Sequence, residues 1–247
     1  MALSHATLGL TSMIFLAGSL VLLWFVILSG VTTTTPLDKT YFLRANTLGI
    51  TGARDVSQWT YFHICSPGNV DCTGASPAMP FGHAWASNPV GAPSELVGKY
   101  GNHTTNHYYW YMWRFGWVFF LISLFFIVCA FFTSFLACLG RLGSALAALT
   151  SLVALVFYSV AVSLMTATFV KARNAFHHAG RSASLGRYAF GFSWGAWAAL
   201  FIATLLFFVG IGFKNGDNVN SRRGWGRRRS TRSTRSFDAR RVKDDYS

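Results

Sequence analysis

The sequence predicts a mainly α-helical membrane protein, with four transmembrane helices, a folded polar segment after the first of them and a basic tail. The chain of 247 residues is 52% hydrophobic and only 12% charged, whereas a soluble domain carries about a quarter charged residues. Its apolar residues fall into long runs, and its charge gathers near the end. Because so few polar residues cannot cover an apolar core of this size, lipid must be the solvent.

The first apolar run, residues 8–28, predicts a transmembrane helix. It contains no charged residue, and at about 1.5 Å per residue roughly twenty residues cross the hydrocarbon layer. A cleaved signal peptide is the alternative, with an apolar core of about 7–15 residues after a positively charged segment. Residues 1–7 contain no Lys or Arg, and the run is longer than such a core. We therefore expect an uncleaved helix after a short N-terminal segment.

Residues 29–116 are polar and long enough to form a small folded cap rather than a turn. A β-branched run at the start and the segment Tyr41–Leu43 favour β-strands. Asn102, followed by His103 and Thr104, forms a glycosylation sequon, which indicates a luminal or extracellular face. We therefore expect an extracellular cap that contains strands.

Two cysteines stand within this cap segment, Cys65 and Cys72, with a Pro-Gly turn between them. A close pair in a polar stretch favours a disulfide in an oxidising compartment. A zinc site is the competing interpretation and would recruit His63 and His83, but the cysteine spacing differs from the usual zinc pattern. We expect the disulfide and no metal.

Aromatic residues crowd the segment from Tyr108 to Trp117, which has the sequence YYWYMWRFGW. Trp and Tyr prefer the membrane–water boundary, where a ring is half buried and its polar atom stays hydrated. We expect an aromatic belt at the outer end of the second span. A core cluster inside the cap is the alternative, and both can be partly true.

The remaining apolar runs predict a second span at 117–139, a third at 144–170 and a fourth at 188–213. Only a turn at 140–143 separates the second from the third, so these two form an antiparallel hairpin. The third span is rich in Ala, Ser and Thr, and small residues let helix backbones approach closely in lipid. We expect that face to pack against another helix, and residues 171–187 to form a short polar loop.

Residues 214–247 form a basic tail that holds eleven of the 21 Lys and Arg residues. Because it follows an apolar span, we expect it to bind the anionic inner leaflet, at about 1 kcal/mol per basic residue, rather than nucleic acid. A solvated tail with an RNA- or export-related basic run is the alternative. The arginines expected to contact lipid are Arg222, Arg223, Arg227, Arg228, Arg229, Arg232, Arg235, Arg240 and Arg241.

Two modifications are suggested by residues near the inner leaflet. Ser230, Ser233 and Ser236 each follow an arginine and are candidates for phosphorylation, which adds up to about two negative charges per site and would release the tail. Cys138, at the inner end of the second span, is a candidate for palmitoylation, with a plain buried thiol as the alternative.

Charge placement predicts the orientation of the chain. By the positive-inside tendency the Arg-rich tail lies in the cytoplasm, and an even number of spans then places both termini there. The loop 171–187 is also basic and has no acid, which disagrees with this topology. The charge excess of the tail, the sequon and the cysteines favour it, so we expect a multi-pass protein with both termini in the cytoplasm.

The spacing Trp59-x5-Cys65-x6-Cys72, inside the long first loop of a four-span chain, resembles the claudin-like superfamily. The preceding residues 41–59, YFLRANTLGITGARDVSQW, resemble the fungal Sur-seven/PalI family, the tetraspan proteins of eisosomes. The resemblance covers residues 5–213.

The resemblance implies a left-handed four-helix bundle with a small extracellular β-sheet cap, closed by a Cys65–Cys72 disulfide and anchored by Trp59. A tryptophan that dips into lipid is the alternative for Trp59. The resemblance also implies residence in furrow-like plasma-membrane domains and a role in organising them, in endocytosis and in cell-wall maintenance. Expected partners are further copies in a lateral array, eisosome-type proteins and lipids such as sterols or sphingolipids. At 62–64, Phe-His-Ile replaces the Gly-Leu-Trp of claudins, which argues against junction or pore function.

No nucleotide-binding loop, paired carboxylates or nucleophile–base arrangement is visible, so we expect a structural membrane-organising protein without enzymatic activity or cofactor. The four acids outside the tail are scattered through the cap: Asp38, Asp55, Asp71 and Glu95. The competing function is a passive channel, a transport-associated subunit or an ambient-pH sensor. Spans without internal ionisable residues argue against proton-coupled transport, while His107, His177 and His178 give weak support to pH sensing.

Overall fold

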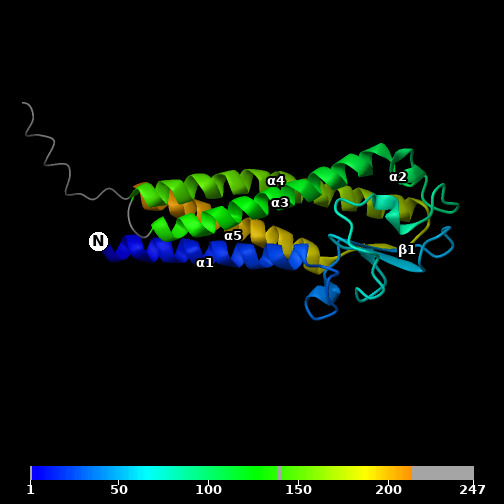
Figure 1. The fold of residues 1–247 in the computed structure, drawn as a ribbon, viewed down its shortest axis with the longest axis horizontal. Helices are drawn as coiled ribbons and strands as arrows, with labels where there is room; N and C mark the ends of the chain where they lie inside the picture. Colours follow the sequence, from blue (N-terminus) through cyan, green and yellow to red (C-terminus); the bar gives the residue numbers. More distant parts are fainter. Residues whose placement is uncertain (1, 138–140, 213–247) are drawn as a thin grey trace, which may run out of the picture. The chain divides into compact units, whose positions relative to one another are not determined.

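The computed structural model describes residues 2–137 and 141–212. Within them the helices lie side by side in a bundle, with a small sheet at one end (Figure 1). This confirms the predicted class, a mainly helical membrane protein with a small β-sheet cap. Four helices are long and apolar enough to cross a membrane: α1 (Ala2–Ile27), α3 (His107–Ala137), α4 (Arg141–His178) and α5 (Arg187–Gly212).

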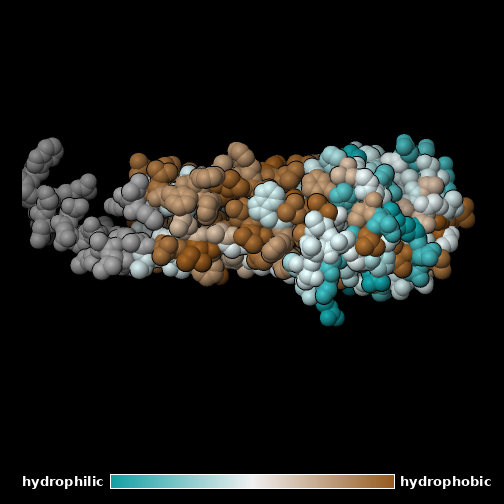
Figure 2. Space-filling view, turned by 60° about the horizontal axis from the view of Figure 1, so that its bottom comes forward, coloured by the Kyte–Doolittle hydropathy of each residue, from teal (hydrophilic) through white to brown (hydrophobic). Residues whose placement is uncertain are grey.

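The sides of the bundle are apolar, as contact with lipid requires. Large side chains point outward, such as Phe125 and Phe132 of α3, which are 63% and 64% exposed. Figure 2 shows this hydrophobic surface giving way to a mostly polar one over the cap. In the most apolar window of each helix, 44% of the residues are buried in α4 but only 28% in α5. α4 is therefore the helix most enclosed by its neighbours.

The enclosed side of α4 is made of small residues. Ala147, Ala148, Ser151 and Ala154 are all buried. α4 packs mainly against α3 and α5, and α1 packs mainly against α5 and α3. Small side chains allow these close approaches in lipid, so the prediction that this face packs against another helix is confirmed.

Hydrogen bonds between helices fix their relative rotation. Ser19 Oγ of α1 donates to the carbonyl of Ala196 in α5 at 2.8 Å. Tyr158 Oη of α4 donates to the carbonyl of Ser193 in α5 at 3.0 Å. Such bonds contribute only about 0.6 kcal/mol each in membrane proteins, so they select a register more than they drive association.

The cap is built on an open antiparallel sheet with the strand order β3-β2-β1-β4. Because β4 lies between α4 and α5 in the sequence, the second polar segment completes a sheet begun by the first. The strands are β1 (Leu43–Asn46), β2 (Val56–Trp59), β3 (Ile64–Cys65) and β4 (Ala183–Leu185). Three short helices accompany them: η1 (Leu37–Lys39), η2 (Phe81–Ala84) and α2 (Tyr100–His103).

Two helices run further into the cap than the predicted spans. α3 begins at His107, within the segment assigned to the cap, and α4 continues to His178. The first half of the predicted loop 171–187 is therefore helical, and part of the remainder forms β4. The physical cause is a buried face on the continuation of α4, where Ala172 and Phe176 are both fully buried.

The β-branched run that follows α1 is not a strand. Residues 31–35 are exposed and lie outside the sheet, and the predicted segment Tyr41–Leu43 overlaps β1 only at its last residue. A half-buried strand needs an apolar side chain at every second position, and the threonines of this run do not provide them. In β1, by contrast, Leu43 and Ala45 face the interior while Arg44 faces outward, which is the alternation that a half-buried strand needs.

Candidate functional site

The cap is fixed to the bundle by a cluster of rings that we name the aromatic junction: Trp59, Phe81, Trp85, Phe169 and Phe176. Trp59 of β2 is 1% exposed and stacks on Phe81 of η2, with ring centroids 5.0 Å apart. Its Nε1 donates to the carbonyl of Phe81 at 2.9 Å. Phe176 of α4 lies 5.9 Å from the Trp59 ring. Trp59 therefore joins β2 to both η2 and α4 and does not reach lipid.

The aromatic segment at the start of α3 divides between two environments. Tyr109, Trp113 and Trp117 are buried. Tyr111 and Phe115 are exposed on another side of the same helix. The core cluster is therefore confirmed for the buried face of α3, and a boundary belt on the exposed face stays a prediction.

A reciprocal pair of hydrogen bonds links the cap to α3. Tyr61 Oη donates to the carbonyl of Trp117 at 2.6 Å, and Trp117 Nε1 donates to the carbonyl of Tyr61 at 3.2 Å. Their rings stack with centroids 5.4 Å apart. Burial raises the pKa of the Tyr61 phenol well above its ordinary value, so the hydroxyl keeps its proton and remains a donor.

A disulfide closes the segment 65–72, which we name the disulfide loop. Cys65 and Cys72 are bonded, with their Cα atoms 4.0 Å apart. The pairing confirms the predicted bridge and removes both thiolates from a zinc site. Within the loop, Asn69 Nδ2 donates to the carbonyls of Leu37 at 2.6 Å and Thr40 at 3.1 Å. The disulfide loop is thereby tied to η1.

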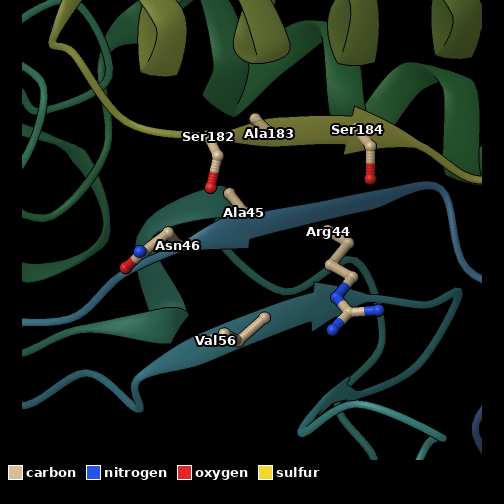
Figure 3. Close-up of a pocket in the computed structure, with 7 residues that line it drawn as sticks. All are labelled: Arg44, Ala45, Asn46, Val56, Ser182, Ala183 and Ser184. Atoms are coloured by element: carbon tan, nitrogen blue, oxygen red, sulfur yellow. The ribbon is translucent and has the colours of Figure 1, made fainter.

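The outer face of the sheet, which points away from the helices, is polar. Cys65, Gln58, Arg44 and Ser184 stand opposite one another on successive strands and form a row across it. In Figure 3, Arg44 and Ser184 extend to the same side of the sheet, whereas Ala183 points toward the helices. A shallow pocket of about 310 Å³ lies on this face, between β1, β2 and β4.

A larger pocket of about 510 Å³ adjoins it and shares Arg44 and Ser184. Its walls come from η1, the disulfide loop, the outer face of the sheet and the start of α5. It is lined by three basic side chains, Lys39, Arg44 and Arg187, and by one acid, Asp38. We name it the basic pocket, because a concave surface with excess positive charge attracts anions.

The sequon lies on an exposed turn of the cap. Asn102 is exposed and has a φ of 58°, within the left-handed region that Asn tolerates. The hydroxyl of Thr104 donates to the carbonyl of Gly101 at 2.6 Å. Occupation of Asn102 by a glycan stays a prediction.

The histidines that follow α1 are spread over the cap and the adjoining ends of α3 and α4. Within the described ranges 2–137 and 141–212, no group of three or more His, Cys, Asp or Glu could hold a metal ion. His63 Nδ1 lies 2.7 Å from the carbonyl of Thr73. His178 Nδ1 lies 3.2 Å from Glu95 Oε1, with both side chains largely exposed. pH sensing by these histidines stays a prediction.

The predicted sites near the inner leaflet lie outside the described residues. They comprise the palmitoylation candidate Cys138, the three tail serines Ser230, Ser233 and Ser236, and the nine tail arginines from Arg222 to Arg241.

The basic pocket was not predicted from the sequence. Its cations come from three separate segments, η1, β1 and the start of α5. The alternation of Leu43, Arg44 and Ala45 was the available signal that Arg44 faces outward. Nothing in the sequence pairs Arg44 with Arg187, because that pairing depends on β4, which joins the sheet after two transmembrane helices.

Comparison with known proteins gives consistent matches. A model of the SUR7/PalI family matches residues 8–206, a region that includes the whole cap. The chain is 31% identical to SUR7 of Saccharomyces cerevisiae over 210 residues, covering 83% of this chain and 67% of that protein. It is 32% identical to SUR7 of Candida albicans over 200 residues (81% and 72%), and 33% identical to the plasma membrane protein YNL194C of S. cerevisiae over 192 residues (74% and 61%). No solved structure matches.

Proposed function

The chain belongs to the SUR7/PalI family, and on that premise we propose that it is a structural protein that organises the plasma membrane by assembling laterally. The description of its relative YNL194C as a plasma membrane protein supports the location. The four helices able to span a membrane support the multi-pass arrangement. SUR7/PalI is a family of structural membrane proteins rather than a known enzyme family, which agrees with the expectation of a non-enzyme.

The observation that carries the proposal is a stripe of bulky apolar side chains left uncovered along α3. Its members are 40–64% exposed and follow one another at spacings of three, four or seven residues, so they share one face of the helix. Helices in lipid associate by van der Waals packing, and large rings offer contact area to a second copy. The stripe comprises Tyr111, Phe115, Val118, Phe125 and Phe132.

We extend the proposal to the finer roles that the family suggests. These are residence in furrow-like, eisosome-type domains, support of endocytosis and maintenance of the cell wall. Both termini would lie in the cytoplasm, with the cap outside, a glycan on Asn102 and the tail on the anionic inner leaflet. Partners would be further copies of the chain, eisosome-type proteins and lipids.

A tagged copy expressed at the cell surface tests the proposal. We expect stationary patches, and dispersal of these patches when Phe125 and Phe132 are both replaced by leucine, which keeps the helix apolar but removes the rings. An even surface distribution of the wild-type chain would contradict lateral assembly. Reconstitution in liposomes separates the competing function, because ion flux without clustering would instead support a channel or transport role.

A further inference from the structure

We propose that the basic pocket binds the headgroup of an anionic lipid that carries both a phosphate and free hydroxyl groups, in the leaflet on the cap side of the membrane. The inference rests on the proposed function only in taking membrane lipids as partners. It adds a site and a chemical class of lipid, and it concerns the leaflet opposite to the one expected for the basic tail.

The positive charge of this pocket has no counterpart in the part of the chain that the structure describes. No ion pair or hydrogen bond there involves the side chains of Lys39, Arg44 or Arg187. Asp38 lines the same pocket but is not within ion-pairing distance of any of them. The lining therefore keeps an excess of two positive charges, and arginine forks match the oxygens of a phosphate.

One of the residues that line the pocket carries a buried acceptor without a hydrogen-bond donor. Gln58 lines the pocket, is 2% exposed, and its Oε1 has no partner among the described residues. Asp38 Oδ1, in the wall, is likewise buried without a partner in this part of the chain. Leaving a buried acceptor unpaired is unfavourable, and a phosphate oxygen, itself an acceptor, does not satisfy it. A hydroxyl group on the same headgroup would satisfy it once the Gln58 side chain turns its oxygen toward the pocket.

The position of the pocket favours a lipid over a soluble anion. Arg187 is the first residue of α5, and the apolar span from Arg187 to Ile211 begins there. Tyr188, 45% exposed, also lines the pocket. A phosphate held at this level would leave the acyl chains alongside α5. The N-terminus of this 26-residue helix adds partial positive charge.

The disulfide loop gives the pocket its shape. Gly68 of the loop lines the pocket, together with Asp38 and Lys39 of η1. Asn69 bonds the loop to the carbonyls of Leu37 and Thr40 on either side of these two residues. The pocket is therefore an arrangement of constrained segments and not a chance gap between mobile loops.

The test compares two lipids of equal charge. The full chain in phosphatidylcholine nanodiscs is exposed to phosphatidylglycerol, whose headgroup has free hydroxyls, or to phosphatidylmethanol, whose headgroup has none. Retained lipid is quantified by mass spectrometry. The basic tail senses charge alone, so it retains both lipids equally. The pocket should favour phosphatidylglycerol by about tenfold, which is the effect of one buried hydrogen bond to a headgroup hydroxyl.

Variants assign the effect to the pocket. Arg44→Gln combined with Arg187→Gln should lower pocket retention of both lipids by about tenfold or more. Gln58→Leu should abolish the preference between the two. Arg173→Gln, which removes a cation of α4 that bonds only to Asn174 among described residues, should change neither. Gel mobility without reductant checks that each variant still forms the Cys65–Cys72 bridge.

Contrary results for lipid selectivity would overturn the inference. Equal retention of both lipids by the wild-type chain would remove the hydroxyl requirement, and a preference unchanged in the pocket variants would place it elsewhere. Competition by glycerol phosphate at matched concentration would assign the pocket to soluble phosphorylated polyols. The nanodisc assay measures lipid selectivity separately from clustering in cells. A chain that clusters in cells but shows no pocket selectivity would contradict this inference alone. A chain that shows pocket selectivity but does not cluster would contradict only the proposed function.

Discussion

Gln58 and Trp59 are adjacent residues of β2, yet they serve opposite faces of the sheet. The indole lies inside the aromatic junction, whereas the carboxamide forms part of the basic pocket. Successive side chains of a strand alternate between faces, so one short strand carries both an anchor and a candidate binding group. Substitutions of Trp59 should therefore change the stability of the cap, whereas substitutions of Gln58 should change its lipid selectivity.

Trp59→Ala should destabilise the cap by about 3–5 kcal/mol, the usual effect of removing a large buried aromatic side chain. It removes the stacking on Phe81 and leaves that residue's carbonyl without its indole donor. Thermal unfolding of the detergent-solubilised chain measures the loss. Trp194→Ala is the matched control, since Trp194 is 42% exposed on the bundle. An equal effect of the two substitutions would show that Trp59 is not a specific anchor.

Cys65→Ser should lower stability by about 2–3 kcal/mol, because the bridge closes a loop of only eight residues. The same change removes the covalent closure of the disulfide loop and leaves its hydrogen bonds in place, among them those of Asn69 to η1 and of Arg54 Nη2 to the Asp71 carbonyl. We expect the variant to be retained in the endoplasmic reticulum, as seen by imaging. Normal surface delivery, with gel mobility unchanged by reductant in the wild type, would contradict the bridge.

The site residues that could be predicted from the sequence are those whose pattern lies within one short segment. The cysteine pair and the tryptophan before it lie within fourteen positions, and the structure confirms the pairing. Asn69 and Gln58 gave no such signal. Asn69 bonds to carbonyls 29 and 32 positions away, and Gln58 is buried because segments distant in the sequence cover it.

At the scale of elements, contacts made by basic residues within the cap account for part of the disagreement in the charge pattern. The segment 171–187 is basic on the cap side, against the expected charge bias. Lys171 lies 3.9 Å from the centroid of the Tyr108 ring, and Arg181 donates to the carbonyls of Leu48 and Gly91 at 2.8 Å each. These cations have structural roles within the cap. Their presence therefore carries less information about orientation than a plain count suggests.

The sequence predicted the helices better than the sheet. Long apolar runs identify spans without knowledge of their neighbours, whereas strands of two to four residues acquire their pattern only from the partners they pair with. β4 in particular has the burial pattern of an edge strand and only three residues. β4 can pair with β1 only because α4 ends at a level that places the residues after it beside β1.

Gly186→Ala should detach β4 from β1. An added Cβ would overlap the carbonyl oxygen of Tyr41, at the point where the Gly186 amide donates to the carbonyl of Phe42. Because backbone and not a flexible side chain occupies that space, the strand must shift. Hydrogen exchange at β1 and β4 measures the change, and selectivity for phosphatidylglycerol should fall with it. Gly191→Ala in α5, where nothing lies within 4 Å of the added Cβ, is the control that should leave both unchanged.

For the whole molecule, the two proposed lipid contacts differ in what they recognise. The basic pocket holds few charges in a defined geometry with a buried acceptor. The tail holds eleven of the 21 basic residues and would respond to surface charge alone, at about 1 kcal/mol per basic residue. A chain that ends at Gly212 retains every described element and should keep lipid selectivity while losing most of its charge-driven binding.

Replacing Ser230, Ser233 and Ser236 together by aspartate should weaken binding of the tail to acidic liposomes. Each substitution places a negative charge directly after an arginine, and the attraction of the basic block to the anionic surface falls accordingly. Co-sedimentation of a tail peptide, residues 214–247, with phosphatidylserine liposomes measures the loss, and alanine at the same positions is the control. Equal binding of the aspartate and alanine peptides would exclude a phosphorylation switch. If the tail acts only by charge, the same substitutions in the full chain should leave the preference for phosphatidylglycerol over phosphatidylmethanol intact, because that preference depends on hydroxyl groups at the opposite face of the membrane.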